Sequence, residues 1–140
     1  MTRLRLILGC VLLMLAATLV AGSAIASSTN VKPRDGQYAG NGKKVVIFFN
    51  AADRNASFAT VRAALPGCDF NYNVLDSDKI SGKGRFTLEA SDSSSTVEVG
   101  GRFISPTKVR GLATVNTSVS GCESGFYTFE FVAERRRGIN

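Results

Sequence analysis

The sequence predicts an all-β domain, either a single antiparallel β-sandwich or a partly open barrel of seven to eight short strands with one disulfide. Short segments rich in β-branched and aromatic residues recur between residues 35 and 134. Clusters of Gly, Ser and Asp separate these segments, as turns separate strands. Two cysteines, Cys68 and Cys122, lie within the same region.

Residues 1–26 have the pattern of an export signal peptide. Arg3 and Arg5 precede an apolar run from Leu6 to Ala21, and Ala24-Ile25-Ala26 supplies the small residues of a cleavage site. Cleavage near Ala26-Ser27 would give a protein that is secreted or associated with the cell envelope. A retained membrane anchor is the alternative, because a signal sequence and a short anchor share the same apolar pattern.

The cysteines have different expected fates. Cys10 lies inside the apolar run and leaves with the signal peptide, whereas a lipidated cysteine would begin the mature chain. Cys68 and Cys122 remain in a chain that folds in an oxidising compartment, where a disulfide is expected. They close a loop of about 55 residues, and the chain-entropy model assigns roughly 4 kcal/mol of stability to such a cross-link.

Domain organisation and charge narrow the function classes. We expect a flexible lead-in at 27–34, a β-domain at 35–134 and a basic disordered tail at 135–140. The net charge falls from +6 to +4 without the signal peptide, and Arg135, Arg136 and Arg137 carry three of the remaining charges. The body of the domain is then almost neutral. Since nucleic-acid binding requires a concentrated basic face, no nucleic-acid partner is expected.

Seven segments have the alternation or the composition of strands: 43–49, 56–65, 70–74, 84–90, 96–104, 109–115 and 127–133. Alternation is clearest at 84–90, where Phe86, Leu88 and Ala90 share one face. Ala56–Leu65 also fits a short helix, and a strand is favoured because its surroundings are β. Gly100-Gly101 predicts a bulge or bend within its strand.

An ordered set of short motifs spans the expected β-domain. They are Gly36-Gln37-Tyr38-Ala39-Gly40, Val45–Phe49, Cys68, Gly84-Arg85-Phe86, Gly101-Arg102-Phe103, Lys108-Val109-Arg110-Gly111 and Cys122-Glu123-Ser124-Gly125. In this order they resemble a recurrent class of small exported bacterial β-domains. The resemblance implies a disulfide-linked β-sandwich. It carries no established activity and therefore assigns no catalytic or binding residue.

Catalysis in this chain would have to use carboxylates. The chain contains no histidine, which excludes Ser-His-Asp and Cys-His catalysis and the commonest zinc sites. A hairpin around the Ser-rich turn would place Glu89 and Glu98 opposite each other, and two carboxylates can hydrolyse a glycosidic bond. The expected outward position of Glu89, beside Arg85 and Thr87, favours a solvated or salt-bridged role instead.

Three further side chains are candidates for ligand contact. Asp76 and Asp78 offer carboxylate oxygens to Ca²⁺, but a turn explains them better because the other acidic ligands of a calcium loop are missing. Tyr38 lies in a glycine-rich segment and is the tyrosine expected to be most exposed, although packing over a sheet edge explains it better than ligand contact. No metal or other cofactor is expected.

The leading hypothesis is an exported, non-enzymatic β-module with a binding or structural role at the cell envelope or outside the cell. Its partner would be a glycan or a protein, held by a sheet edge or by exposed loops at 53–55, 76–83 and 92–95. A carboxylate-dependent glycan hydrolase and a small secreted protease inhibitor are the alternatives, since such folds support all three roles.

Overall fold

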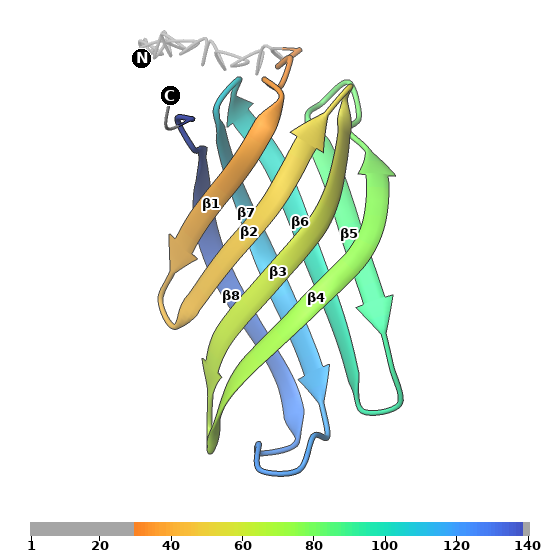
Figure 1. The fold of residues 1–140 in the computed structure, drawn as a ribbon, viewed down its shortest axis with the longest axis vertical. Coiled ribbons are helices and arrows are strands. Elements are labelled where there is room, and N and C mark those ends of the chain that lie inside the picture. The colour runs from red at the N-terminus through yellow and green to blue at the C-terminus, as the bar shows by residue number, and fades with distance from the viewer. Residues whose placement is uncertain (1–29, 139–140) are drawn as a thin grey trace, which may run out of the picture.

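The computed structural model describes residues 30–138, which form an all-β structure of eight strands (Figure 1). The strands are β1 (Gly36–Gly42), β2 (Val45–Ala52), β3 (Asn55–Leu65), β4 (Cys68–Lys79), β5 (Arg85–Ser91), β6 (Ser95–Ser105), β7 (Lys108–Thr117) and β8 (Gly125–Arg135). The expected signal peptide, its cleavage site and the start of the lead-in lie outside the described residues. No helix within residues 30–138 is long and apolar enough to cross a membrane.

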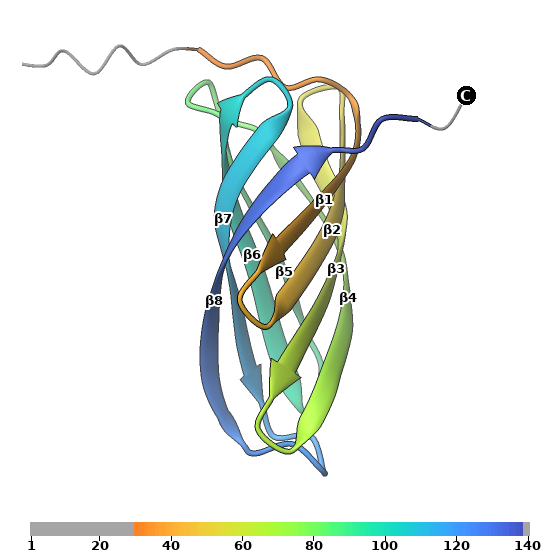
Figure 2. The same ribbon diagram turned by 90° about the vertical axis from the view of Figure 1, so that its left-hand side faces the viewer.

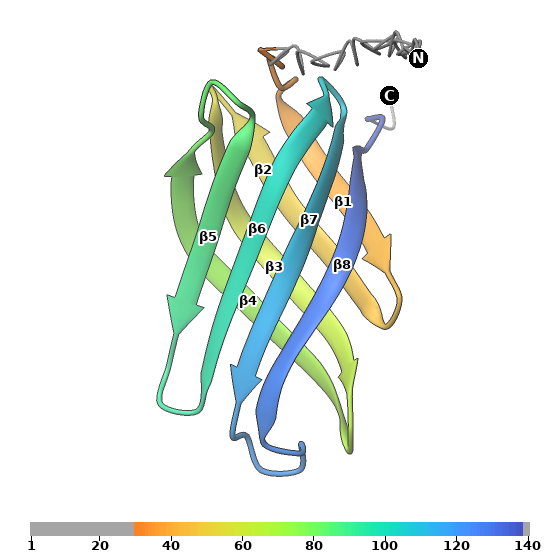
Figure 3. The ribbon, with the colours of Figure 1, turned by 180° about the vertical axis from the view of Figure 1, so that it is seen from behind.

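All eight strands belong to one antiparallel sheet that curls into a nearly closed barrel. The order is β4-β3-β2-β1-β8-β7-β6-β5, so the first and last strands of the chain are hydrogen-bonded neighbours. Their pairing runs from Tyr38–Arg135 to Asn41–Val132. Strands β1–β4 form one wall and β5–β8 the other (Figures 1 and 3), and β1 meets β8 at one side (Figure 2). Of the two expected architectures, the partly open barrel is therefore the one that forms.

The seven expected strands are all present, and β3 confirms the strand interpretation of residues 56–65. The eighth strand, β1, contains three glycines and closes the sheet. A Cβ at Gly40 would lie 2.8 Å from the Val132 carbonyl oxygen of β8. Small residues in β1 therefore allow β1 to lie close to β8, and this pairing joins the two walls of the barrel.

The barrel has one seam, between β4 and β5, where backbone pairing is replaced by side-chain hydrogen bonds. The Asp78 carboxylate accepts a hydrogen bond from the Thr87 backbone N–H at 2.7 Å, and the Asp76 carboxylate accepts one from the Glu89 N–H at 2.9 Å. Both aspartates lie within β4, so the expectation that residues 76–78 form a turn is wrong. Instead, the two carboxylates satisfy backbone donors on an otherwise open strand edge.

The interior of the barrel is filled by side chains. Alternate residues of each strand point inward, and the core holds 23 buried hydrophobic residues among those described. Four aromatic rings form its largest cluster: Tyr38 stacks on Phe49 with ring centroids 5.1 Å apart, and Phe86 and Phe103 complete the contacts. Strands of a small barrel can enclose a core of this kind without leaving room for a ligand.

Gly100 and Gly101 do not form the expected bulge. The pairing of β6 with β7 continues through both glycines, and its register shifts later, between Phe103 and Ser105. A Cβ at Gly101 would lie 2.5 Å from the ring of Phe86. Glycine is required there because the Phe86 ring packs against the backbone of the neighbouring strand.

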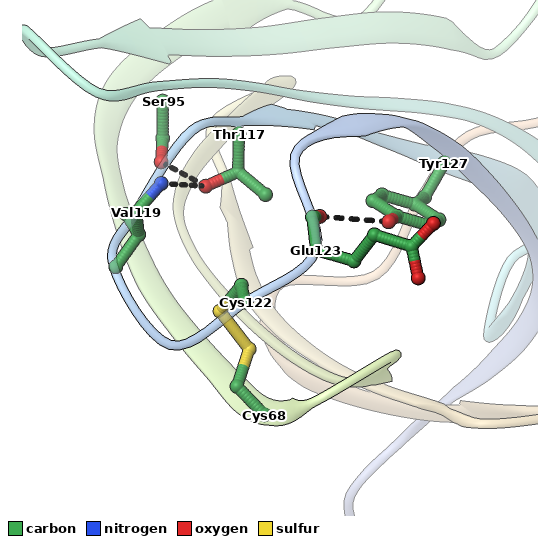
Figure 4. The surroundings of a disulfide bond; sticks show 7 residues. All are labelled: Cys68, Ser95, Thr117, Val119, Cys122, Glu123 and Tyr127. Carbon is green, nitrogen blue, oxygen red and sulfur yellow. Dashed lines mark hydrogen bonds between the residues drawn. A yellow bond between two sulfur atoms is a disulfide. The ribbon is translucent and has the colours of Figure 1, made fainter.

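One end of the barrel, here called the disulfide end, is crossed by the β7–β8 loop. The predicted Cys68–Cys122 disulfide is confirmed, and it joins this loop to the start of β4 (Figure 4). The Glu123 N–H donates to the Pro66 carbonyl oxygen at 2.9 Å, so a hydrogen bond accompanies the covalent link. The disulfide therefore joins opposite walls of the barrel at a place where no strand pairing joins them.

The opposite end, here called the terminal end, holds both termini of the described chain (Figure 1). It consists of five segments: residues 30–36, 52–55, 78–85, 102–110 and 134–138. Backbone hydrogen bonds connect these segments to one another. They run from the N–H groups of Arg34, Ile80, Phe103 and Arg135 to the carbonyl oxygens of Pro106, Arg54, Gly84 and Thr107, respectively. Arg135 belongs to β8, and the Arg136 N–H donates to the Gln37 carbonyl oxygen. The ordered barrel thus includes two residues that the sequence assigned to the tail.

Candidate functional site

Because the interior is packed, surface chemistry decides where a ligand can bind. The outward residues of β5, β6, β7 and β8 lie in register across four adjacent strands and form a surface here called the β5–β8 face (Figure 3). Three of its rows, read from the terminal end toward the disulfide end, carry most of the polar chemistry. They are Arg85, Arg102 and Arg110; Glu89, Glu98, Thr114 and Thr128; and Ser91, Thr96, Asn116 and Phe126.

Glu89 and Glu98 are direct cross-strand partners, as a hairpin around the turn at 92–95 predicted. Both side chains are exposed, and they line a hollow of about 290 Å³ together with Thr96, Thr114, Asn116 and Phe126. Like charges that face each other across strands destabilise the sheet slightly, so this pair is not explained by fold stability. The arrangement offers two carboxylates, two hydroxyls and an amide to one ligand.

Phe126 adds an exposed aromatic surface to the hollow. Its side chain is 70% exposed, although it is a large apolar residue in a strand. Its neighbours Tyr127 and Phe129 point toward the core, so Phe126 lies on the outer face by alternation. An exposed ring beside hydrogen-bonding groups provides a stacking surface for the apolar face of a ligand.

A larger hollow, of about 900 Å³, adjoins the same strands where β1 ends. It lies between the β1–β2 turn and the outer surface of β7 and β8, and its lining includes Lys43, Arg110, Leu112, Thr128 and Glu130. Thr128 pairs with Thr114, which lines the smaller hollow. The two hollows therefore lie on adjoining parts of the β5–β8 face.

Tyr38, which the sequence placed in an exposed position, is fully buried in the core. Its single hydroxyl proton is shared between two acceptors, the carbonyl oxygens of Arg34 at 2.7 Å and Pro106 at 3.0 Å. Burial is the main cause of a raised pKa for Tyr38. Its role is structural, because it holds the lead-in against the β6–β7 turn.

The acidic groups do not form a metal centre. Asp76 and Asp78 are engaged at the seam, and among residues 30–138 no group of three or more His, Cys, Asp or Glu side chains could hold a metal ion. The turn expected at 92–95 is present. Asp92 accepts hydrogen bonds there from the backbone N–H groups of Ser94 and Ser95, which lower the pKa of its carboxyl.

The residues that complete the hollow around Glu89 and Glu98 were missed at the sequence level. Thr96, Thr114 and Asn116 are common surface residues of strands, and nothing in the sequence shows which strands are neighbours. Phe126 carried a usable signal, since it is an aromatic residue on the opposite face from Tyr127, Phe129 and Phe131. Comparison with protein-family models, with curated proteins and with solved structures finds no match for this chain.

Proposed function

We propose that this protein is an exported binding module that holds a glycan on its β5–β8 face. One observation carries the proposal: Glu89 and Glu98 face each other in register beside the exposed ring of Phe126, within one hollow. Carboxylate oxygens accept hydrogen bonds from sugar hydroxyls, and the aromatic ring stacks on the C–H face of a sugar. The packed interior favours a ligand on the outer surface.

Binding is favoured over glycoside hydrolysis by the placement of the carboxylates. Hydrolysis requires two carboxyl groups that flank the bond, one of which keeps a proton because its surroundings are apolar. Glu89 and Glu98 project from the same outer surface, and both are exposed. This geometry suits joint hydrogen bonding to one side of a ligand.

An affinity series on residues 27–140 tests the proposal. Oligosaccharides of neutral, amino and acidic sugars would be screened, and the tightest ligand would be measured by calorimetry. Removing a hydrogen bond to a charged group costs about 1.5 kcal/mol at an exposed site, so Glu89→Gln and Glu98→Gln should each weaken binding about tenfold. Phe126→Ala should weaken binding similarly. The controls are Glu123→Gln, an exposed carboxylate outside the hollow, and Leu75→Ala, which removes an apolar side chain that is 77% exposed on β4.

The result would contradict the proposal if both control variants weakened binding as much as the Glu89 and Phe126 variants do. Release of new reducing ends by the wild-type protein, abolished in Glu89→Gln or Glu98→Gln, would instead establish the hydrolase. Inhibition of an extracellular protease that is lost on changes within one loop would establish the inhibitor.

A further inference from the structure

The basic residues are segregated at the terminal end, although the body of the domain is almost neutral on average. Of the fifteen Lys and Arg residues among residues 30–138, twelve lie at the terminal end: Lys32, Arg34, Arg54, Lys79, Lys83, Arg85, Arg102, Lys108, Arg110, Arg135, Arg136 and Arg137. The same segments hold four of the eleven carboxylates, namely Asp35, Asp53, Asp78 and Glu134. The rest of the barrel has three cations and seven carboxylates. The nearly neutral average therefore combines a cationic end with a remainder that is slightly acidic.

These cations are available to an external partner. All twelve are exposed apart from Lys108, which is half-buried and forms the one ion pair within residues 30–138, with Glu134 at 3.0 Å. Arg85, Arg102 and Arg110 are consecutive cross-strand neighbours. Like charges aligned in this way destabilise the sheet unless an anion lies over them, so the row is better explained by a partner than by the fold.

Apolar side chains lie among the cations. Ile104 is 47% exposed and Pro106 is also exposed, both where β6 turns into β7. A hollow of about 580 Å³ is lined by three cations, Lys32, Arg34 and Arg135, by one carboxylate, Asp35, and by Pro33 and Pro106. Cations surrounding exposed apolar groups are the combination that binds at the surface of an anionic bilayer.

The shape of the basic surface distinguishes a bilayer from a linear polyanion. Its charges come from five separate segments that together form a whole end of the barrel (Figures 1 and 2), rather than from one stripe or groove. A broad end of this kind presents many cations to a planar surface at once. The described chain also starts at this end, at residue 30.

We infer that the terminal end docks on an anionic lipid bilayer and that the barrel then stands on the membrane with its disulfide end outward. This inference goes beyond the proposed function and does not depend on it. In this orientation the hollow that contains Glu89, Glu98 and Phe126 lies on the side of the barrel, toward the end that faces away from the lipid. The module is thereby held at the membrane while its β5–β8 face stays accessible.

Vesicle co-sedimentation of residues 27–140 tests the inference. The vesicles would contain phosphatidylcholine alone or with 30 mol% phosphatidylglycerol, at low and high NaCl concentrations. We expect binding to the anionic vesicles alone, and loss of that binding at high salt. In the terminal variant Lys32→Gln/Lys83→Gln/Arg137→Gln, partitioning should fall about 100-fold, because each basic residue near an anionic surface contributes about fivefold. None of these three side chains makes a hydrogen bond with another described residue, so the fold should be retained.

The matched control removes the same net charge elsewhere. Lys43→Gln/Lys44→Asn/Arg62→Gln neutralises the three cations outside the terminal end, and asparagine suits the positive φ of residue 44. The partitioning of this variant onto anionic vesicles should fall less than fivefold. Equal losses in the two variants would overturn the inference, since binding would then follow net charge rather than the terminal end. Binding to soluble dextran sulfate without binding to anionic vesicles would also overturn it, in favour of an acidic polymer.

Orientation can be read separately by fluorescence, because the chain contains no tryptophan. In Ile104→Trp the emission should shift to the blue when anionic vesicles are added, since residue 104 would enter the interface. In Phe126→Trp it should not shift. A blue shift in Phe126→Trp alone would indicate that the opposite end contacts the membrane, and it would refute docking by the terminal end.

Discussion

The seam between β4 and β5 gives the sharpest test of the fold. Asp76 and Asp78 each accept one hydrogen bond from a β5 backbone N–H, at 2.9 and 2.7 Å, and both aspartates are half-buried. A hydrogen bond to a charged group contributes about 1.5–3 kcal/mol, and water can reach an open strand edge, so the lower value applies. Asp76→Ala/Asp78→Ala should therefore lower the free energy of unfolding by about 2–3 kcal/mol. For a domain of this size, that corresponds to a fall in Tm of about 10 °C.

Hydrogen exchange localises the same effect. The backbone N–H groups of Thr87 and Glu89 should exchange faster in the double alanine variant, while exchange in the middle of β7 should change only with global stability. Asp76→Asn/Asp78→Asn keeps an acceptor oxygen at each position, so its free energy of unfolding should fall less than that of the double alanine variant. Asp69→Ala removes an exposed carboxylate from the same strand and should have no effect. Unchanged exchange at Thr87 and Glu89 in a folded double alanine variant would refute the seam.

Three further predictions concern stability. Cys68→Ser should lower the free energy of unfolding by roughly 4 kcal/mol and Tm by about 15 °C under oxidising conditions, because the disulfide closes a 54-residue separation; an unchanged Tm would exclude a structural disulfide. Tyr38→Phe should cost about 1–2 kcal/mol in denaturant unfolding, since the carbonyl oxygens of Arg34 and Pro106 lose a donor; a loss below about 0.3 kcal/mol would show that the hydroxyl does not hold the lead-in. The pKa of the Asp92 carboxyl in the folded protein lies below the ordinary aspartate value of about 3.9, because backbone N–H groups donate to it. The ionised carboxylate therefore stabilises the fold above about pH 3.9, and this stabilisation is lost as the pH falls through the lowered pKa. Acid unfolding of Asp92→Asn should lack that part of the pH dependence, and identical acid transitions in the two proteins would contradict it.

The sequence predicted seven of the strands from a two-residue hydrophobic period or from a dense run of β-branched and aromatic residues, and both signals depend on local residues alone. It also predicted that Glu89 and Glu98 would oppose each other, because the short turn at 92–95 sets the register of its hairpin. The closure by β1 was not predicted as a strand pairing, since three glycines give this segment a weak strand propensity. Its pairing with β8 joins residues about 95 positions apart.

The wrong predictions share one physical cause, which is that local propensity does not show neighbours in space. Asp76 and Asp78 favour turns on their own, but here an adjacent strand edge supplies donors for their carboxylates. Tyr38 was expected at the surface because of the glycines around it, whereas those glycines allow β1 to pack closely and bury the ring. The net charge does not show that most cations lie at one end of the barrel, because the turns and termini that carry them meet only in the folded chain.

The most direct test of the central claim is an NMR titration of isotope-labelled residues 27–140 with the oligosaccharide that binds most tightly in the screen. If the β5–β8 face holds the glycan, the amide shifts should concentrate at Glu89, Glu98, Thr114, Asn116 and Phe126. In Glu98→Gln the same shifts should require about tenfold more ligand, because that variant binds about tenfold more weakly. Shifts confined to the outer surface of β2, β3 and β4, with those five amides unchanged, would contradict the account.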